Sequence, residues 1–510
     1  MTRTVHPGDA AAYRAAGWWG DETVATRVAR HRAERPAATA FVDTDSRMTW
    51  EEYDTRSTAL AAALADAGVE PGDRVAVRLP DTAHVHVAFL ACEKAGAIVV
   101  GIGSRAGERE VLHLLDRTGA TTIVTPDHLR GLDTRDEAGA ASRLAGRALG
   151  PDDVFMLNST SGTTGLPKVV VHTQNRWFYF HQLAVQAGRL TGVDVFLSLI
   201  PAPFGFGLWT AHFTPTILGA PCGLLDHFTP GGALDLIERE QVTVLCCVST
   251  QFLMLLEEPS FRSRDLSSLR CMFTGGEAVP YERAAAFEDA TSAAVLQFYG
   301  SNETGALSRT TFDDDREHRF RTAGRVIPDM QVRLFDEKGG DVTATGGPGR
   351  PAGRGPATCL GYLDDDDANR ALFTDDGWML MGDLVEIDDD GYVRVIGRTS
   401  DFVIRGGKNI SAPAVEEEVV SHPAVAVAAV VAMPDPIFGE RVCAYVELRP
   451  AATLTLDELI AHLDDRGVSK EWFPEHLVVL DELPRSSGGK VAKGELRADI
   501  RRRLGFGVAE

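Results

Sequence analysis

The decapeptide STSGTTGLPK (residues 159–168) lies between two apolar runs, DVFMLN (153–158) and VVV (169–171). This pattern predicts a loop between two strands. Glycine lets a backbone approach an anion closely with its N–H groups turned toward it. The loop adds hydroxyl donors and one cation, on Ser159, Thr160, Ser161, Thr163, Thr164 and Lys168. We therefore predict that it binds a polyphosphate. It is not a Walker A loop. That motif needs four residues between its first glycine and Gly-Lys-Ser/Thr, whereas only two residues separate Gly162 from Gly165 and a proline precedes Lys168.

Length and composition set the class of protein. A chain of 510 residues is too long for one core, so we expect two or more domains. No apolar run approaches about 18 residues and the N-terminus lacks an apolar signal core, so we expect a cytoplasmic protein with no membrane partner. The net charge of −22 argues against general nucleic-acid binding. The seven cysteines lack zinc-type spacing and are expected to be reduced and mostly buried.

The first part of the chain alternates helix-like and strand-like patterns. Helices are expected over 50–67 and 84–95, and strands over 73–79, 97–102 and 121–124. This alternation predicts a largely parallel sheet flanked by helices.

The later part of the chain has a different character. From residue 321 the segments shorten and Gly, Asp and Pro dominate, which predicts hairpins and a small β unit. The chain from residue 400 to the end has its own alternation of helix and strand and the size of a small domain. We predict an α/β protein with a large N-terminal domain of parallel-rich sheets over 1–398 and a small α+β domain over 399–510. Residues 130–150, polar and rich in Ala and Gly, are interpreted as a surface connection.

Three expected strands end in glycine-rich loops. They are PAPFGFGLW (201–209), GGEAVP (275–280) and GSNETG (300–305). Ligands of open α/β sheets bind at the carboxyl ends of strands, so we expect these loops to converge on one site. Glycine and proline interleaved with aromatic residues in PAPFGFGLW favour a shaped pocket wall over a helix.

Five separated segments together resemble the motifs of the adenylate-forming superfamily, which includes acyl- and aryl-CoA ligases, adenylation domains and luciferases. In the family's order they are STSGTTGLPK, GGEAVP, YGSNETG (299–305), MGDLVEIDDDGYVRVIGR (381–398) and PRSSGGKVAKGELR (484–497). The resemblance implies an enzyme that uses ATP and Mg²⁺ to join a carboxylic acid to AMP with release of pyrophosphate, and then passes the acyl group to a thiol. It also implies a C-terminal lid domain that rotates between these two half-reactions.

By this resemblance, four of the segments hold the nucleotide. The phosphate loop embraces the β- and γ-phosphates, Tyr299 stacks on adenine, and Asp383 and Arg398 hold the ribose. Glu303 helps to hold Mg²⁺, a hard cation that prefers oxygen ligands, and Asn302 stands where the family has threonine. The nucleotide-binding candidates are Thr160, Ser161, Gly162, Thr163, Thr164, Lys168, Gly275, Gly276, Glu277, Tyr299, Gly300, Asn302, Asp383 and Arg398.

The resemblance places Lys490 at the reactive position of the C-terminal domain. There it bridges the acid and the α-phosphate and stabilises charge that develops in the transition state, so the catalytic candidates are Lys490 and Glu303. Lys493 is expected to be a surface residue. RGGKNISAPAVEEE (405–418) resembles the loop that serves thioester formation, where glycines let a pantetheine arm pass close to the backbone. Ser400 departs from the aspartate or lysine of the family hinge.

The acid pocket is predicted from position and composition. Phe204 matches the family's mobile aromatic residue beside the phosphate loop. The other expected wall residues are Phe206, Trp209, Val248, Ser249 and Ser301. An aromatic, glycine-shaped pocket suits a planar or cyclic acid better than a long acyl chain. The strings VHTQN and GSNE also resemble benzoate-type ligases, although each phenylalanine fits a plain core role equally well.

Three acceptors remain open for the second step. The first is coenzyme A, and the second is the phosphopantetheine arm of a carrier protein. The third is a nitrogen compound, as in ligase-like enzymes that use ATP for nitrogen chemistry such as diazotisation of an aryl amine with nitrite. The departures from the family pattern at Phe204, Asn302 and Ser400 are the reason to retain this alternative. A further alternative is that this chain is a non-catalytic relative that only binds a nucleotide or a partner. The retention of the catalytic and nucleotide-binding candidates argues against it. We expect a monomer or a homodimer.

Overall fold

The computed structural model describes residues 7–44, 46–132, 134–159, 167–276, 279, 281–336, 338–398, 402–405, 408–435, 439–486 and 490–505. The chain forms two compact units. The first comprises residues 1–160, 166–332 and 352–380, and the second 161–165, 333–351 and 381–510. The predicted α/β class with a large N-terminal and a small C-terminal part is confirmed. The predicted domain boundary between residues 398 and 399 adjoins residues outside this description and stays a prediction.

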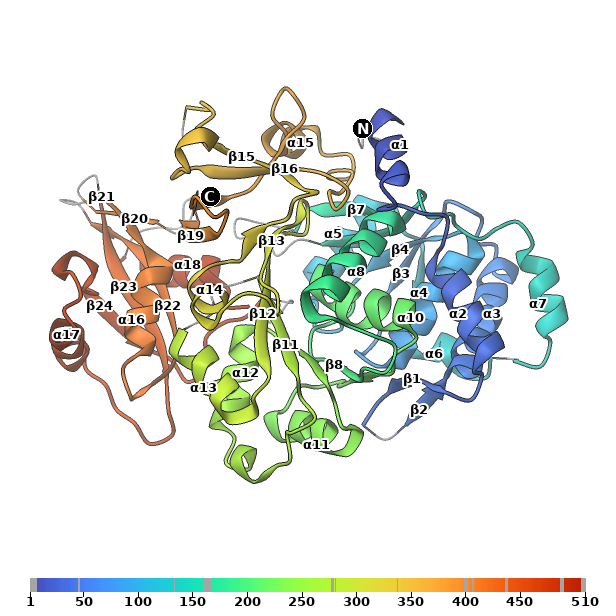
Figure 1. Ribbon diagram of the computed structural model, residues 1–510, viewed down its shortest axis with the longest axis horizontal. Coiled ribbons are helices and arrows are strands. Elements are labelled where there is room, and N and C mark those ends of the chain that lie inside the picture. Colours follow the sequence, from blue (N-terminus) through green and yellow to red (C-terminus); the bar gives the residue numbers. More distant parts are fainter. Residues whose placement is uncertain are drawn as a thin grey trace. The chain divides into compact units, whose positions relative to one another are not determined.

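A five-stranded sheet of the first unit contains the strands on both sides of the predicted phosphate loop (Figure 1). Its order is β5-β3-β4-β6-β7, parallel except for β7. Its strands are β3 (Arg74–Val77), β4 (Ile98–Gly101), β5 (Thr122–Val124), β6 (Val154–Ser159) and β7 (Val169–Thr173). Ser159 of β6 pairs with Val169 of β7, so the predicted strands on both sides of the loop are confirmed.

Local capping explains the ends of the helices in this part. The hydroxyl of Thr49 accepts a hydrogen bond from the amide of Glu52, whose side chain accepts one from the amide of Thr49, so the helix begins at Trp50. Helices α2, α3 and α4 lie side by side in Figure 1. The helices are α1 (Pro7–Ala15), α2 (Val24–Glu34), α3 (Trp50–Asp66), α4 (Ala83–Ala95), α5 (Glu108–Thr118), α6 (Pro126–Leu129) and α7 (Glu137–Leu144). The described residues of 130–150 lie largely at the surface, as predicted, and include a helix, α7, that the sequence did not indicate.

A nine-stranded sheet of the first unit contains the strands that precede the other predicted loops. Its order is β14-β13-β12-β11-β10-β8-β9-β1-β2, and β9, β8, β10, β11 and β12 are parallel. Its strands are β1 (Thr39–Val42), β2 (Arg47–Thr49), β8 (Phe196–Ser198), β9 (Cys222–Leu224), β10 (Val244–Cys246), β11 (Cys271–Gly275), β12 (Ala294–Ser301), β13 (Gly305–Arg309) and β14 (Arg325–Val326). The segments that follow β8, β11 and β12 therefore leave one edge of the sheet.

The chain after β8 is helical where the sequence favoured an irregular wall. It forms α9 (Gly205–Gly207), a π-helical turn η1 (Leu208–Phe213) and α10 (Thr214–Leu218). The six residues of η1 are all buried, and a buried backbone must satisfy its own hydrogen bonds, which a helix does. The remaining helices of this unit are α8 (Gln174–Gly188), α11 (Pro230–Glu240), α12 (Ser249–Glu257), α13 (Tyr281–Thr291), α14 (Arg316–Arg321) and α15 (Asp366–Leu372).

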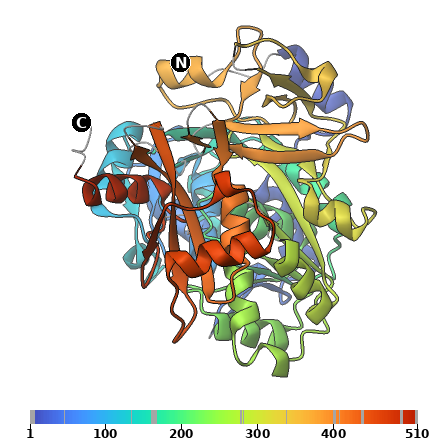
Figure 2. The same ribbon diagram turned by 90° about the vertical axis from the view of Figure 1, so that its left-hand side faces the viewer.

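The second unit combines a hairpin with a sheet that is covered on both faces. Strands β18 (Asp383–Ile387) and β19 (Val393–Arg398) form the hairpin. The sheet contains β20 (Phe402–Arg405), β21 (Lys408–Ser411), β22 (Val425–Asp435), β23 (Gly439–Leu448) and β24 (His476–Val479). Helices α16 (Ala412–Val420) and α17 (Leu456–Asp465) pack with Val430, whereas α18 (Lys493–Arg503) packs with Ala429 and Val431. Because successive side chains of a strand point to opposite faces, the helices cover both faces, as Figure 2 shows.

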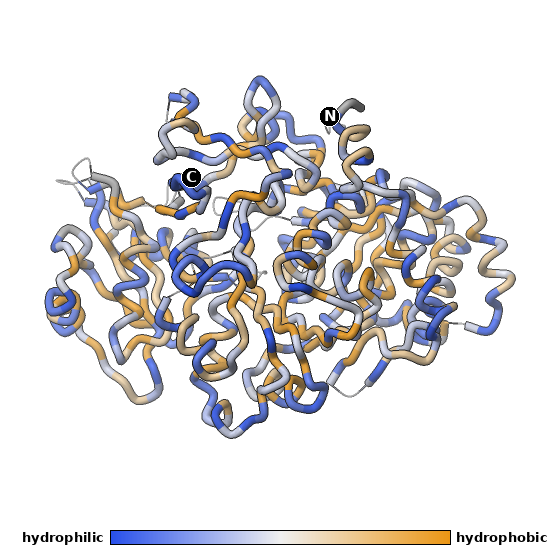
Figure 3. The backbone as a smooth tube through the Cα atoms, viewed as in Figure 1, coloured by the Kyte–Doolittle hydropathy of each residue, from blue (hydrophilic) through white to orange (hydrophobic). Residues whose placement is uncertain are grey.

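Hydrophobic residues follow the strands and inner helices of each unit (Figure 3), and many of them are buried. All seven cysteines are buried thiols, in line with the prediction of reduced and mostly buried cysteines. None of the described helices is both long enough and apolar enough to cross a membrane.

Candidate active site

The best-defined candidate site lies in the first unit, around Glu303 and Tyr362. The Tyr362 hydroxyl donates a 2.7 Å hydrogen bond to Glu303 Oε1, and Lys168 Nζ lies 4.8 Å from the centroid of the Tyr362 ring. Burial and the Glu303 carboxylate raise the pKa of Tyr362, so the phenol stays protonated and donates. The cation that ends the predicted phosphate loop and the predicted metal ligand thus share one tyrosine.

The loop around Glu303 is held by its own hydrogen bonds. The Ser301 hydroxyl accepts from the amides of Glu303 and Thr304, at 3.2 and 3.0 Å. The Glu303 carbonyl accepts from the amide of Cys359 at 2.8 Å. Ser301 was predicted as a pocket wall, and its hydroxyl is occupied in holding this loop.

Glu303 fits the predicted Mg²⁺ ligand. Among the described residues no hydrogen bond engages Glu303 Oε2, which leaves one carboxylate oxygen available. Nor do those residues include a cluster of three or more His, Cys, Asp and Glu side chains that could hold a metal. Mg²⁺ is commonly held by one or two carboxylates together with substrate phosphates, so a single glutamate beside a phosphate loop suits this ion.

Four polar side chains, on Asn158, His172, Arg176 and Asn302, connect two of the predicted loops through β6. Asn158 Oδ1 accepts from Asn302 Nδ2 and lies 2.7 Å from His172 Nε2. Asn158 Nδ2 donates to the carbonyl of Pro203 at 3.0 Å, and His172 Nδ1 lies 2.6 Å from a guanidinium nitrogen of Arg176. Arg176 also donates to the carbonyls of Asn302 and Ala357, at 3.0 and 2.8 Å. These hydrogen bonds bring PAPFGFGLW and GSNETG together, as expected. Residues 277, 278 and 280 of GGEAVP lie outside the described residues, so the convergence of that third loop on the same site stays a prediction.

Burial sets the charges of this group. It lowers the pKa of Arg176 to about 10, which keeps the guanidinium positive at neutral pH. Burial and the neighbouring Arg176 cation lower the pKa of His172 well below its ordinary value, so this imidazole is neutral. Arg176 thus supplies a buried positive charge whose hydrogen-bond acceptors are all neutral.

Trp209 is the centre of an aromatic cluster beside these loops. Its ring stacks on Phe206 with centroids 5.4 Å apart and an interplanar angle of 10°. Phe273 and Phe298 meet it edge-on, at 5.3 and 5.5 Å. Trp209 is buried, whereas Phe206 and Phe204 are half-buried. Trp209 therefore acts as core, and the two phenylalanines remain candidates for an acid pocket.

The structure describes only some of the other predicted residues of the phosphate loop, the adenine segment and the acid pocket. Gly275 ends β11 and Tyr299 lies on β12. Gly276 has a φ of 82°, which favours glycine, and a Cβ on Gly300 would lie 1.8 Å from the carbonyl oxygen of Gly305. Ser249, at the start of α12, is buried. Thr160, Ser161, Gly162, Thr163, Thr164 and Glu277 lie outside the described residues.

In the second unit, the β18–β19 hairpin brings two predicted ribose residues together. Asp383 pairs with Arg398 across the two strands at the open end of the hairpin, and Asp383 is buried. Lys490 is half-buried, and its carbonyl accepts from the amide of Ser486 at 2.7 Å. Lys493 corrects our prediction of a surface residue, because Nζ pairs with Glu416 Oε1 at 2.7 Å and its side chain is 16% exposed.

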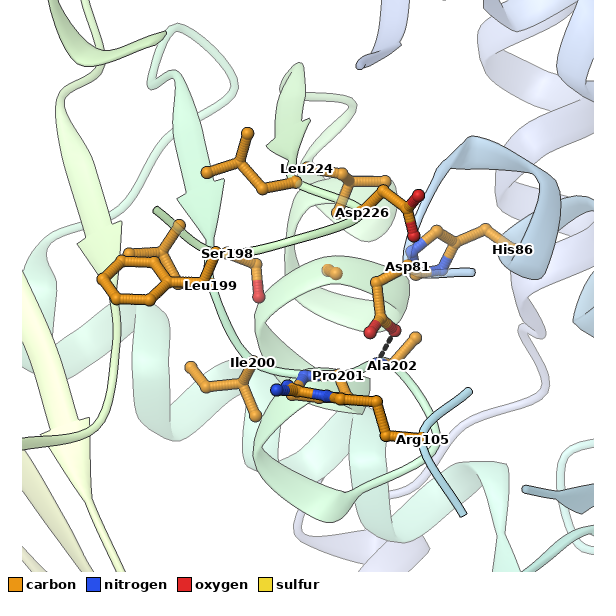
Figure 4. Close-up of a pocket in the computed structure, with 13 residues that line it drawn as sticks. Asp81, His86, Arg105, Ser198, Leu199, Ile200, Pro201, Ala202, Leu224 and Asp226 are labelled. Carbon is orange, nitrogen blue, oxygen red and sulfur yellow. Dashed lines mark hydrogen bonds between the residues drawn. The ribbon is translucent and has the colours of Figure 1, made fainter. Parts of the chain in front are cut away.

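A small cavity lies under the segment that leads to Phe204 (Figure 4). Asp81, His86, Arg105, Ser198 and Asp226 line it among others. The Asp81 carboxylate accepts a 3.0 Å hydrogen bond from the amide of Ala202, so it anchors this segment. Burial raises the pKa of Asp81 from 3.8 to about 6.

This raised pKa predicts a pH-dependent stability. The folded chain binds the Asp81 proton more tightly than the unfolded chain, so stability falls as pH rises from about 4 to 6 and stays lower above that range. In Asp81→Asn the amide oxygen still accepts from Ala202 and the charge is gone. We expect this variant to gain on the order of 2 kcal/mol over the wild type at pH 8, and much less at pH 4.5. Thermal unfolding at both pH values tests this, and an equal gain at both would contradict it.

The sequence did not reveal Tyr362, Asn158, His172 or Arg176 as site residues. His172 and Arg176 are four residues apart at the junction of β7 and α8, a spacing at which side chains can meet. That spacing was the available signal for these two. Tyr362 and Asn158 reach the site only through long-range contacts.

Comparison with known proteins identifies relatives over nearly the whole chain. The model of the AMP-binding enzyme family matches residues 28–363, and that of the AMP-binding enzyme C-terminal domain matches residues 414–490. The medium-chain fatty-acid–CoA ligase of Escherichia coli is 32% identical, covering 100% of this chain and 96% of that protein. The salicyl-AMP ligase / salicyl-S-ArCP synthetase of Mycobacterium tuberculosis is also 32% identical, covering 96% and 92%. An anthranilate CoA ligase in complex with anthranoyl-AMP shares the fold, with a TM-score of 0.85, 24% identity, and coverage of 96% and 98%.

Proposed function

The chain belongs to the adenylate-forming family of AMP-binding enzymes, and from this premise we propose that it activates an aryl or cyclic carboxylic acid and transfers it to coenzyme A. The observation that carries the proposal is the arrangement of Lys168, Tyr362 and Glu303. Asn302, next to Glu303 in sequence, is hydrogen-bonded to Asn158, which also holds the carbonyl of Pro203 just before the half-buried Phe204. This supports a site that combines groups suited to phosphates and a cation with an aromatic wall.

In the first step a carboxylate oxygen of the acid attacks the α-phosphorus of ATP. The bond from this phosphorus to the bridging oxygen breaks, and pyrophosphate leaves with the electron pair. Lys168 and the hydroxyls of its loop hold the β- and γ-phosphates, Tyr299 stacks on adenine, and Asp383 and Arg398 hold the ribose. Glu303 would hold Mg²⁺, which, when bound, neutralises charge on the phosphates. Lys490 stabilises charge at the α-phosphate in the transition state.

In the second step the thiol sulfur attacks the acyl carbon, loses its proton, and AMP leaves. Residues 405–418 of the second unit serve this step. The hairpin of β20 and β21 pairs Arg405 with Lys408 around Gly406 and Gly407, which lie outside the described residues. Glycine at those positions suits the close passage of a pantetheine arm.

The choice of acid rests on the aromatic wall. Half-buried phenylalanines offer flat apolar surface to a planar ring, because aromatic pairs gain from offset or edge-on contact. A relative at 32% identity that is named for salicylate supports an aryl acid, whereas the relative named for medium-chain fatty acids supports a flexible chain. We favour the aryl or cyclic acid because the buried Trp209 stacks on Phe206 and holds that ring as a flat wall.

A carrier protein is the second candidate for the acceptor. The relative named salicyl-AMP ligase / salicyl-S-ArCP synthetase favours it. Both acceptors present the same thiol of a pantetheine arm, so the chemistry of the second step does not separate them.

The test is pyrophosphate release across a panel of aryl, cyclic and short-chain acids, each with and without CoA, with mass spectrometry of the products. We expect release that depends on one class of aryl or cyclic acid, and its CoA thioester among the products. Acid-dependent release without a thioester would move the acceptor to a carrier protein or to nitrogen chemistry. If none of the acids causes release of pyrophosphate, the proposal is overturned.

A further inference from the structure

The orientation of the buried Asn158 amide is fixed by a carbonyl group. Asn158 is 1% exposed, and its Nδ2 donates to the carbonyl of Pro203 at 3.0 Å. The reversed amide would set its oxygen against that carbonyl oxygen, and two acceptors cannot hydrogen-bond. Asn158 Oδ1 must therefore face His172 and Asn302, and it can only accept.

This orientation determines the protonation of His172. Because Asn158 Oδ1 only accepts, His172 Nε2 must carry the hydrogen that it donates over 2.7 Å. A neutral imidazole then has Nδ1 as an acceptor. Arg176, which only donates, lies 2.6 Å from Nδ1 and satisfies it. Arg176, His172 and Asn158 therefore form a hydrogen-bond relay with a single direction, from the guanidinium to the Asn158 oxygen.

The relay ends on Asn302, which stands where the family has threonine. Asn158 Oδ1 would repel an oxygen at this distance, so the Asn302 atom that lies 2.7 Å from it must be the donor Nδ2. In return, Asn302 Oδ1 accepts from Asn158 Nδ2 at 3.5 Å. The Asn302 oxygen lies against Gly205, where a Cβ would come within 2.8 Å of it. Arg176 holds the main chain of the same residue through the Asn302 carbonyl. The amide group of Asn302 is thus fixed, and Nδ2 has a second hydrogen to donate.

We propose that the Arg176–His172–Asn158 relay sets Asn302 as a hydrogen-bond donor to an oxygen of the bound nucleotide, in the place of the threonine hydroxyl. The inference rests on the proposed function and adds three positioning residues to it. A free asparagine offers its oxygen or its nitrogen equally well, and an oxygen turned toward a phosphate would repel it. The relay removes that choice, whereas a threonine hydroxyl rotates to donate without help.

A double-mutant cycle between positions 158 and 302 tests the proposal. In Asn158→Leu the acceptor is lost and Asn302 is released. We expect a loss of about 30-fold in kcat for acid-dependent ATP–pyrophosphate exchange, with the KM of the acid within about threefold. In the Asn302→Thr background the same substitution should cost less than about threefold, because threonine does not need the relay. The structural damage from Asn158→Leu is common to both backgrounds and cancels in the cycle.

Two matched controls separate the relay from a general loss of packing. Asn175 is also 1% exposed and hydrogen-bonded, to Gly20 and Asp152, so Asn175→Leu removes a comparable buried amide. Arg309, like Arg176, donates to neutral acceptors, on Leu183 and Gln186. We expect Arg176→Met to lower kcat about 30-fold or more, and Asn175→Leu and Arg309→Met to lower thermal stability while kcat stays within about threefold.

Binding of Mg²⁺ and ATP, measured by calorimetry in the same variants, keeps the inference separate from the proposed function. We expect Asn158→Leu to weaken ATP binding about tenfold in the wild-type background and little in the Asn302→Thr background. If the wild type binds ATP and activates no acid, the proposed function fails and this cycle still decides on the relay. Equal losses from Asn158→Leu in both backgrounds, in exchange or in binding, would overturn the relay.

Discussion

Replacement of Lys490 by alanine is expected to abolish formation of the acyl-adenylate and to leave transfer from preformed adenylate to the thiol nearly intact. The lysine would stabilise charge that appears at the α-phosphate only while the carboxylate attacks. Loss of one such group costs about 100-fold to 1,000-fold in rate. Acid-dependent ATP–pyrophosphate exchange measures the first half-reaction. Single-turnover reaction of synthetic acyl-adenylate with CoA measures the second.

Lys493→Ala is the matched control for this prediction. Lys493 lies three residues away in the same motif, and its ammonium group is paired with Glu416 at 2.7 Å. Its loss should lower the stability of the second unit, by about 1 kcal/mol, and leave the exchange rate within a few-fold of the wild type. Equal loss of both half-reactions in Lys490→Ala would contradict the division of labour between the two steps. Loss of exchange in Lys493→Ala alone would move the catalytic role to that residue.

The parts of the fold and site that could be predicted are those written in local sequence. The strands on both sides of STSGTTGLPK follow from short apolar runs and a glycine-rich interval, and the structure has them as β6 and β7. The cross-strand pair of Asp383 and Arg398 lies within one hairpin. A capping residue such as Thr49 marks the start of a helix through hydrogen bonds that span only four residues of sequence.

The rest depends on contacts between distant residues. Tyr362 and Glu303 are 59 positions apart, and Asn158 and Asn302 are 144 apart, so no local pattern joins them. Local composition was also misleading at residues 205–213. Glycine and proline interleaved with aromatic residues favoured a shaped pocket wall, whereas the segment is helical and its residues 208–213 are all buried. Lys493 looked like a surface lysine because its partner Glu416 lies on another helix.

The second large effect is expected at Glu303. In Glu303→Gln the side chain keeps its size and an oxygen that can accept the 2.7 Å hydrogen bond from Tyr362, but it loses the charge that would hold Mg²⁺. A carboxylate is a far better ligand of this hard cation than a neutral amide. We therefore expect the exchange rate to fall about 100-fold, as for loss of one charge-stabilising group, and to need more Mg²⁺ for half-maximal rate. Exchange measured over a range of free Mg²⁺ at fixed ATP checks both effects.

Tyr362→Phe separates the charge of Glu303 from its position. This variant removes the hydroxyl that donates to Oε1, yet it keeps the aromatic ring near Lys168 and the Glu303 carboxylate. A hydrogen bond to a charged group contributes about 1.5–3 kcal/mol in general, and the partly exposed Glu303 can turn to water in its place, so a loss near tenfold is expected. The requirement for Mg²⁺ should change little. If Tyr362→Phe matched Glu303→Gln in both rate and Mg²⁺ dependence, the role of Glu303 would be to hold the loop. If Glu303→Gln kept the wild-type rate and Mg²⁺ dependence, the metal would be held by other groups.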